Sequence, residues 1–268
     1  MMSQLKISLI QTTLFWENAS KNRTHFESKI ASLPETDLIL LPEMFSTGFS
    51  MNITEVSESM NGETIEWMQK MAEKKQAVVC GSLIIKEGDN YFNRLIWMPP
   101  NGNLVHYDKR HLFRMAGEND YFSGGEKRTI IELKGWKICP LICYDLRFPV
   151  WSRNRNQTDR KTFVEPEYDL LIYIANWPQP RVDAWKKLLY ARAIENQVFV
   201  AGLNRIGTDG NEVPYSGGSM VLNAKGEELW TAADHQEEIQ TIRLDLKTLE
   251  EFRKKFPVGM DGDKFELS

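Results

Sequence analysis

Short apolar runs alternate with longer segments of helical periodicity along most of the chain. The short runs are rich in Ile, Leu and Val, which is typical of strands. The expected strands are Leu5–Gln11, Leu38–Leu41, Ala77–Ile85, Tyr91–Met98, Leu104–Asp108, Thr129–Leu133, Trp136–Cys143, Leu170–Ala175, Val198–Asn204, Gly218–Leu222 and Glu238–Leu244. Apolar residues at helical spacing predict helices at Asn18–Leu33, Glu63–Lys75, Val182–Asn196 and Leu246–Phe256, and a short helix after Phe148. This alternation predicts an α/β layered fold with mixed sheets.

The sequence contains turns but no evident domain boundary. Pro99–Gly102 separates two expected strands, and its Asn-Gly pair tolerates positive φ angles, which predicts a hairpin. No linker rich in Pro, Gly and Ser divides the chain, and the polar segment Asn154–Glu167 is the best candidate for an inserted loop. We therefore expect residues 1–268 to form one domain made of two similar halves.

Composition narrows the class of protein. Hydrophobic residues make up 42% of 268, enough for a large core, and the net charge of −4 argues against a nucleic-acid or membrane-surface role. No apolar run approaches the roughly 18 residues of a membrane span, and the N-terminal residues lack a signal-peptide pattern. Three cysteines, Cys80, Cys139 and Cys143, suit free thiols in a reducing compartment. We expect a cytoplasmic protein.

Three segments at or just beyond the ends of expected strands carry groups that suit catalysis. Glu43 follows an apolar run that ends at Pro42, Lys109 follows the second strand of the hairpin, and Cys143 stands where a strand gives way to a turn. In open α/β sheets, ligands bind beyond the carboxyl ends of strands. Side chains at such ends can therefore meet although they are far apart in the sequence.

An acid, an ammonium and a thiol together suit the hydrolysis of an amide. A carboxylate can take the proton of the thiol, which then attacks the carbonyl carbon. An ammonium and a backbone N–H can hold the resulting oxyanion, and one such donor is worth about 3–4 kcal/mol. Ammonia leaves with a proton from the acid, and water cleaves the thioester. Each residue alone is more often structural, so the interpretation depends on all three and on their local context.

That context resembles a known family. The segments Leu41–Glu43, Asp108–Phe113 and Cys143–Pro149 resemble the signatures of the nitrilase, or carbon–nitrogen hydrolase, superfamily. The order Glu, Lys, Cys and the spacings of 66 and 34 residues also fit, and the resemblance runs from Leu5 to about Phe256. It implies an α-β-β-α sandwich, which is usually a homodimer with paired sheets, and it implies no cofactor and no metal.

The same resemblance implies roles for individual residues. Glu43 would be the general base, Lys109 would stabilise the oxyanion and Cys143 would be the nucleophile. The backbone N–H of Tyr144 would be the second oxyanion donor. Glu118 looks like the family's second glutamate, which helps to position the lysine and the substrate.

Other segments resemble parts of the family's substrate pocket. Ala175–Pro178 is similar to a pocket-wall segment, which makes Trp177 an aromatic wall, and Arg192–Asn196 is similar to a helix-end motif that we expect to be structural. Arg147 is expected to orient the cysteine turn by bonding carbonyls or acids, or to bind the substrate. Asn176 is a further candidate for substrate binding.

Within the superfamily, the sequence most resembles the bacterial omega-amidases. The resemblance lies in the following segments: Thr47–Ser50, Tyr91–Leu95, Tyr107–Phe113 followed by Glu118, Cys143–Pro149 and Ala175–Pro178. These enzymes remove the distal amide of 2-oxo dicarboxylate monoamides such as 2-oxoglutaramate. The carboxylate of such a substrate needs a cationic or donor-rich partner, and Arg147, Arg110, His111 and Asn176 are candidates. Another amidase or carbamoylase with a different acyl group is the nearest alternative.

Alternatives from other classes explain fewer residues. A Cys–His hydrolase would use His111 or His106 to activate Cys143, but this leaves Lys109 without a role. A metal enzyme is not indicated, because the sequence has no Cys-x-x-Cys or His-x-x-x-His pattern. Cys139 lies four residues before Cys143 along a strand pattern, a spacing that does not form a ligand cage. A nucleotide-binding protein would show a glycine-rich phosphate-binding motif, which this sequence lacks. A non-catalytic binding scaffold would be expected to have lost one of the three catalytic groups.

Overall fold

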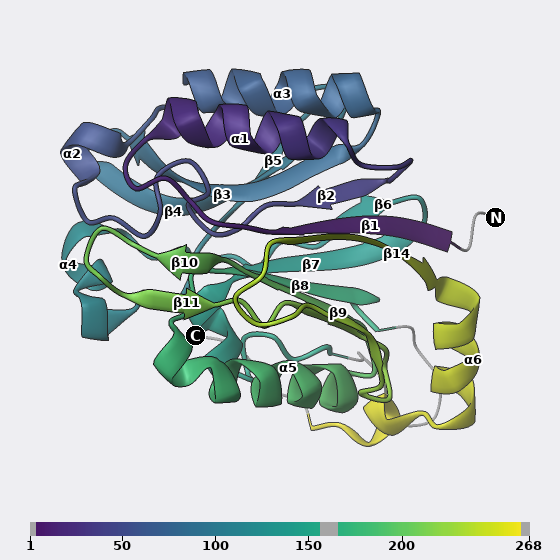
Figure 1. Cartoon of the computed structure of the whole chain (residues 1–268). Coiled ribbons are helices and arrows are strands. Elements are labelled where there is room, and N and C mark those ends of the chain that lie inside the picture. The colour runs from purple at the N-terminus through teal and green to yellow at the C-terminus, as the bar shows by residue number, and fades with distance from the viewer. Residues whose placement is uncertain (1–3, 156–165, 264–268) are drawn as a thin grey trace.

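Two six-stranded sheets pack against each other between outer layers of helices (Figure 1). The computed structural model describes residues 4–155 and 166–263. In the order of hydrogen bonding, the first sheet consists of β14 (Glu238–Asp245), β1 (Gln4–Gln11), β2 (Leu38–Leu40), β3 (Val78–Glu87), β4 (Asn90–Met98) and β5 (Val105–Asp108). The second consists of β13 (Glu228–Thr231), β12 (Met220–Leu222), β9 (Phe199–Asn204), β8 (Leu170–Ala175), β7 (Trp136–Ile142) and β6 (Ile131–Leu133). The expected α-β-β-α sandwich of two mixed sheets is confirmed.

Helices cover the outer face of each sheet (Figure 1). The long ones are α1 (Ala19–Ala31) and α3 (Glu63–Lys75) on the first sheet, α5 (Val182–Asn196) on the second, and α6 (Leu246–Lys255) beside the sheets. Short elements include α2 (Ile53–Val56), α4 (Glu118–Tyr121) and the two-stranded pair β10 (Ile206–Thr208) and β11 (Pro214–Ser216). The 3₁₀ helices are Arg114–Ala116, Cys143–Arg147, Gln179–Arg181 and Val258–Asp261.

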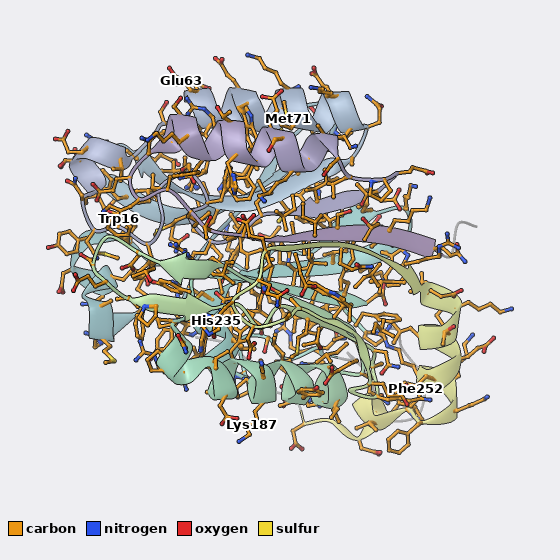
Figure 2. The ribbon with its side chains drawn as sticks, viewed as in Figure 1. Trp16, Glu63, Met71, Lys187, His235 and Phe252 are labelled. Atoms are coloured by element: carbon orange, nitrogen blue, oxygen red, sulfur yellow. The ribbon has the colours of Figure 1, made fainter. Side chains whose placement is uncertain are left out.

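Alternation along the strands places hydrophobic side chains on both faces of each sheet. Leu38 and Leu40 of β2 face the second sheet, whereas Ile39 faces the layer under α1 and α3. Figure 2 shows side chains filling the space between the layers, with Glu63 and Lys187 on the outer helices at opposite sides of the molecule. The core therefore has three slabs, one between the sheets and one under each helical layer.

The two sheets repeat one pairing scheme. From β14 to β5 the successive pairings are antiparallel, parallel, parallel, antiparallel and antiparallel, and the same series runs from β6 to β13. This agrees with the two similar halves expected from the sequence. Parallel strands next to one another place their carboxyl ends at one edge, where the loops gather.

Most of the expected elements are present, and two of the long helices have the expected bounds. The exception is the short helix expected after Phe148, which is wrong. A 3₁₀ helix instead precedes that residue at Cys143–Arg147, because Asp145 binds back to the end of β7, and residues 148–155 form turns and irregular structure. Most of the expected inserted loop Asn154–Glu167 lies outside the described residues. No helix in the described parts is long and apolar enough to cross a membrane.

Candidate active site

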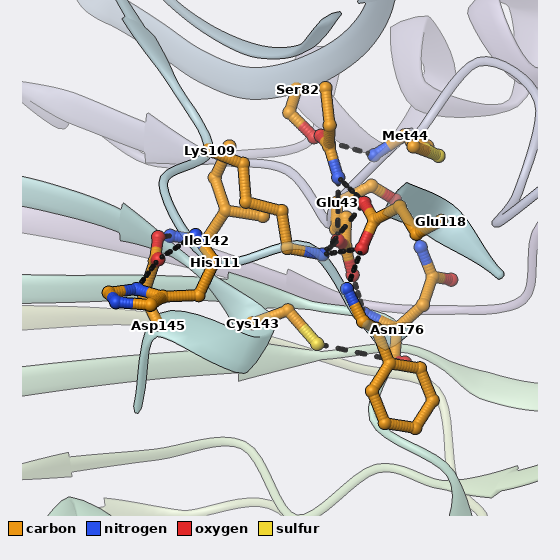
Figure 3. Close-up of polar contacts among 12 residues, drawn as sticks. Glu43, Met44, Ser82, Lys109, His111, Glu118, Ile142, Cys143, Asp145 and Asn176 are labelled. Atoms are coloured by element: carbon orange, nitrogen blue, oxygen red, sulfur yellow. Dashed lines mark hydrogen bonds and ion pairs between the residues drawn. The ribbon is translucent and has the colours of Figure 1, made fainter. Parts of the chain in front are cut away.

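Four strand ends bring the candidate groups to one place (Figure 3). Glu43 follows β2, Lys109 follows β5, Cys143 follows β7 and Asn176 follows β8. Glu118, the first residue of α4, joins them. Because these elements come from both sheets, the site lies where the two halves meet.

An ammonium between two carboxylates forms the centre of the site. Lys109 Nζ lies 2.8 Å from Glu43 Oε1, and 3.0 Å and 2.9 Å from the two carboxylate oxygens of Glu118. All three side chains are fully buried. Buried charges are stable only when they are paired and hydrogen-bonded, and this group meets that condition.

The backbone around Lys109 is held from two sides. The Lys109 N–H donates to Asn93 O at 3.0 Å, and the guanidinium of Arg94 donates to both carboxylate oxygens of Asp108 at 2.6 and 2.9 Å. Gly125 crosses so close that a Cβ there would lie 2.1 Å from Asp108 O. Only glycine fits this crossing, which keeps the end of β5 in place.

Two amides fix the Glu43 carboxylate. Asn93 Nδ2 donates to Glu43 Oε1 at 2.8 Å and also to Glu118 at 3.2 Å, so one amide links the two acids. The backbone N–H of Asn176 donates to Glu43 Oε2 at 2.7 Å, and its side-chain amide donates to Glu43 O at 2.6 Å. Asn176 O in turn lies 3.9 Å from Cys143 Sγ, which places the thiol beside the acid.

Cys143 occupies a strained turn. Its φ angle is +43°, a left-handed conformation that is unfavourable for a residue with a side chain. Strained residues of this kind cluster at functional sites when the surroundings hold them firmly. Here the turn projects the sulfur out of the strand, and the residue is only 8% exposed.

Asp145 holds that turn from within. Its buried carboxylate accepts hydrogen bonds from Ile142 N at 3.1 Å, His111 N at 3.0 Å and Tyr107 Oη at 2.7 Å, and the His111 ring lies 2.8 Å away. The imidazole also stacks on Phe148, with a ring-centre distance of 3.7 Å. The carboxylate therefore ties the end of β7 to the segment that follows Lys109.

Arg192, not Arg147, bonds the cysteine turn. The buried Arg192 guanidinium donates to Leu146 O at 2.6 Å, which agrees with the structural role expected for its helix-end segment. The expectation that Arg147 orients the turn through carbonyls or acids is wrong, because its guanidinium instead lies 5.0 Å above the Trp177 ring. Arg147 faces a pocket that Cys143, Tyr144, Asn176 and Trp177 also line.

That pocket encloses about 190 Å³, and most of its walls are apolar or aromatic. Phe49, Phe113 and Trp177 contribute aromatic rings. Lys109 reaches the pocket, whereas the side chains of Glu43 and Glu118 are completely buried behind it. The space suits a small molecule whose reacting atom approaches the thiol.

Burial controls the protonation of the site. It raises the pKa of the Cys143 thiol well above its usual range, and the carboxylates of Glu43 and Glu118 add to the rise against the opposing charge of Lys109. Burial alone would lower the pKa of Lys109, but Glu118 and Glu43 outweigh it and raise that pKa. Burial also raises the pKa of Glu118. The resting site therefore holds a neutral thiol beside a charged lysine.

The alternative of a Cys–His pair finds no support in the geometry. His111 is held by Asp145 and Phe148, and no hydrogen bond joins it to Cys143 in the described part of the chain. His106 is an exposed residue of β5. After burial itself, the carboxylate that contributes most to the raised pKa of the Cys143 thiol is that of Glu43, and the thiol donates to Asn176 O at 3.9 Å.

The Carbon-nitrogen hydrolase family profile matches residues 2–254, which is most of the chain. The chain belongs to the carbon–nitrogen hydrolase family. The superfamily expected from the motifs is thus confirmed, and as a member the chain is an enzyme that hydrolyses amides.

Similar proteins extend over the full length of this carbon–nitrogen hydrolase. Omega-amidase YafV of Escherichia coli strain K12 is 44% identical over 266 residues, which cover 99% of this chain and 100% of the relative. A 2-oxoglutaramate amidase of Bacillus subtilis strain 168 is 32% identical over 259 residues, covering 95% and 96% of the two chains. The crystal structure of XC1258 from Xanthomonas campestris, a CN-hydrolase superfamily protein with an arsenic adduct in its active site, has a TM-score of 0.95 and 41% identity, with full coverage of both chains.

Several contacts of this hydrolase were not expected from its sequence. The expected group of Glu43, Lys109, Glu118 and Cys143 does meet, and Trp177 does line the pocket. Asn93, Asp145 and Arg181 were not singled out. Asn93 and Asp145 lie inside motif segments that pointed to the family, so a signal was present, whereas Arg181 ends the 3₁₀ helix before α5 and lies outside those segments. The catalytic roles themselves stay predictions and are proposed below.

Proposed function

We propose that this carbon–nitrogen hydrolase is an omega-amidase, which removes the distal amide of small 2-oxo dicarboxylate monoamides and releases ammonia. The observation that carries the proposal is a thiol at a small pocket, with an acid–lysine–acid group buried behind it. The full-length similarity to Omega-amidase YafV and to a 2-oxoglutaramate amidase supports this choice of acyl group.

In the first step Cys143 Sγ attacks the amide carbon, and its proton passes to Glu43. The neutral resting thiol requires such a base, because a preformed thiolate would be poorly stabilised beside two carboxylates. The carbonyl oxygen gains negative charge as the C–S bond forms. Lys109 Nζ and the Tyr144 backbone N–H stabilise this oxyanion.

In the second step the tetrahedral intermediate collapses to a thioester. Glu43 returns the proton to the amide nitrogen, the C–N bond breaks and ammonia leaves. Water then attacks the thioester carbon while Glu43 accepts a proton, and the second tetrahedral intermediate releases the acid and restores the thiol. Glu118 keeps Lys109 aligned throughout, through the two contacts at 3.0 and 2.9 Å.

Asn176 serves both the base and the substrate. Its N–H groups hold Glu43, and its buried side-chain oxygen has no hydrogen-bond partner among the described residues. A substrate amide carries N–H donors that suit such an acceptor. This favours an amide over an ester as the group that is cleaved.

A substrate panel with ammonia detection tests the proposal. It contains 2-oxoglutaramate, 2-oxosuccinamate, glutamine, an N-carbamoyl amino acid and a simple nitrile. We expect the highest kcat/KM for a 2-oxo amide, and higher turnover of glutamine, the carbamoyl compound or the nitrile would overturn the acyl assignment.

Variants of the acid and the thiol test the mechanism. Cys143→Ala and Glu43→Gln are expected to abolish turnover, and iodoacetamide is expected to modify Cys143 stoichiometrically with loss of activity. An inert Cys143 together with no cleavage of any amide would favour a binding scaffold.

The proposal includes assembly and location. Homodimer formation is supported by exposed apolar side chains near one end of α5, where Val150 and Ile194 are each 53% exposed and Arg153 donates to Glu195 O at 2.6 Å. A monomer in sedimentation experiments would contradict it. A cytoplasmic location is supported by the three cysteines, which are all free. Recovery of the native protein with an intramolecular disulfide would contradict that location.

A further inference from the structure

We propose that Arg147 and Arg181 together read the acyl end of the substrate. They bind its carboxylate and 2-oxo oxygen, and they reject a 2-amino group at the same carbon. This inference rests on the proposed omega-amidase function and deepens it, because it names the residues that distinguish a 2-oxo acid amide from an amino acid amide.

The two arginines enter the pocket from different elements. Arg147 ends the 3₁₀ helix that begins at Cys143, and Arg181 immediately precedes α5. Both guanidinium groups lie over aromatic rings, Arg147 over Trp177 at 5.0 Å and Arg181 over Phe113 at 5.4 Å. The Trp177 indole N–H donates to Arg181 O at 2.7 Å. The ring that packs against Arg147 is therefore hydrogen-bonded to the backbone of Arg181.

Neither guanidinium has a counterion among the residues that the structure describes. Across residues 4–155 and 166–263, no ion pair involves Arg147 or Arg181, and the only hydrogen-bond partner of the Arg181 guanidinium is the Met115 sulfur at 3.9 Å. Both residues are half-buried. A cation over an aromatic face keeps its N–H donors available at its edges, and a guanidinium matches the geometry of a carboxylate.

The one acid that lines the pocket in the described parts of the chain is held by its own loop, and no ion pair joins it to either arginine. Asp209 Oδ1 accepts from Asn211 N at 2.8 Å and from Val213 N at 3.0 Å, and its Oδ2 accepts from the hydroxyl of Tyr215 at 2.9 Å. Its loop therefore fixes the orientation of this carboxylate. The charge of the Lys109 ammonium is balanced by Glu43 and Glu118, with which it is in contact.

The pocket is consequently polarised. With all side chains in their usual ionised forms, the group of Glu43, Glu118 and Lys109 has a formal charge of −1, whereas Arg147, Arg181 and Asp209 together have +1. An anionic amide is repelled from the first end and attracted to the second, which turns its neutral amide towards Cys143.

The span of a five-carbon substrate suits this arrangement. Its carboxylate carbon lies about 5 Å from its amide carbon when the chain is extended. Arg147 follows Cys143 by four residues in one 3₁₀ helix, about 8 Å along the helix axis. A long arginine side chain can close the remaining gap.

The same two groups discriminate between oxo and amino substrates. Guanidinium groups only donate hydrogen bonds, and both a carboxylate and a 2-oxo oxygen accept them. A 2-ammonium group is itself a cationic donor, so it would meet two like charges at this end of the pocket. Specificity thus comes from repulsion of glutamine as well as attraction of the oxo acid.

Four amides with five-carbon chains separate these contributions. They are 2-oxoglutaramate, glutaramate without the oxo group, L-glutamine with an amino group, and pentanamide without a carboxylate. The kcat/KM of each is measured by ammonia release for the wild type and for Arg147→Gln, Arg181→Gln and Arg147→Lys. Arg243→Gln is the matched control, because that arginine is exposed on β14.

Each Gln variant is expected to lose about 10- to 100-fold in kcat/KM for 2-oxoglutaramate, the range of one charged hydrogen bond. Pentanamide should change less than about threefold, which also shows that the thiol end is intact. The ratio of 2-oxoglutaramate to glutamine should fall in both variants. Arg147→Lys should lose less activity than Arg147→Gln, because it keeps the positive charge but not the two parallel N–H donors of the guanidinium.

The outcomes separate this inference from the function. If the wild type prefers 2-oxoglutaramate but the Gln variants slow all four amides equally, the arginines are structural and the inference fails while the function stands. If the ratio of 2-oxoglutaramate to glutamine is unchanged in both variants, their role in rejecting the amino group is excluded. If the wild type itself prefers pentanamide or glutamine, the proposed function fails first.

Discussion

Replacing Lys109 by methionine removes the ammonium while it keeps most of the side-chain volume. In the wild-type group two carboxylates lie within 3.0 Å of one ammonium, for a formal charge of −1. Lys109→Met leaves Glu43 and Glu118 as two buried acids that, in the described parts of the chain, only Asn93 bridges. Both catalysis and folding should suffer, for different reasons.

The two losses have different sizes. Loss of one oxyanion donor costs about 3–4 kcal/mol of transition-state stabilisation, so kcat should fall about 100- to 1,000-fold. Breaking a buried ion pair by removing one partner costs about 3–5 kcal/mol of unfolding free energy. Uptake of a proton by one of the acids limits the second loss at low pH, because it removes one of the two facing charges.

A second substitution separates these effects. Lys109→Met combined with Glu118→Gln has the formal charge of the wild type but no ammonium. We expect the double variant to regain about half of the lost unfolding free energy and none of the lost rate. Lys21→Met is a suitable control, because Lys21 is exposed on α1.

Urea denaturation and ammonia release measure the two quantities on the same preparations. Activity of the double variant within tenfold of the wild type would refute the role of Lys109 at the oxyanion. A single variant as stable as the wild type at neutral pH would refute the account of the buried charges.

Three further predictions concern the turn, its support and a distant ion pair. At Cys143, where φ is +43°, glycine should be about 1 kcal/mol more stable than alanine in urea denaturation, with both variants inactive; equal stability would deny the strain. Asp145→Asn should lower the unfolding free energy by about 3 kcal/mol and slow the alkylation of Cys143, because it places an amide donor against N–H and O–H donors. An unchanged alkylation rate would show that Asp145 does not position the thiol. Burial would raise the pKa of Glu237, but the hydrogen bonds from Lys29 and Thr12 outweigh it and lower that pKa to about 2. A folded-state pKa below the ordinary 4.5 stabilises the protein above pH 4.5, and the contribution disappears as the pH falls towards 2. Because this side chain is 42% exposed, solvent screening limits the difference between Glu237→Gln and the wild type to about 1 kcal/mol at pH 7; a difference that stays constant down to pH 2 would contradict the assignment.

The spacing of apolar residues was enough to predict the longer helices and strands, which bury one face or both faces along their length. Helices at Glu63–Lys75 and Val182–Asn196 have the expected bounds, and the strand at Leu170–Ala175 is also as expected. The short strands β10, β11 and β13 were not predicted, although the equally short β2 and β12 were. A strand of that length has too few alternating positions to show a period, and pairing with a neighbour decides whether it forms.

The sequence by itself indicated the family and singled out the candidate reactive groups, because the segments around Glu43, Lys109 and Cys143 each keep a local pattern. Only the tertiary structure decided which partner each group has. It assigned Arg192 to the cysteine turn, left Arg147 over Trp177 and brought Arg181 to the pocket from the start of α5. The physical reason is that a charge is balanced only by groups that lie within a few ångströms of it. Which groups lie that close depends on how the two sheets and α5 pack, and not on the neighbouring residues in the sequence.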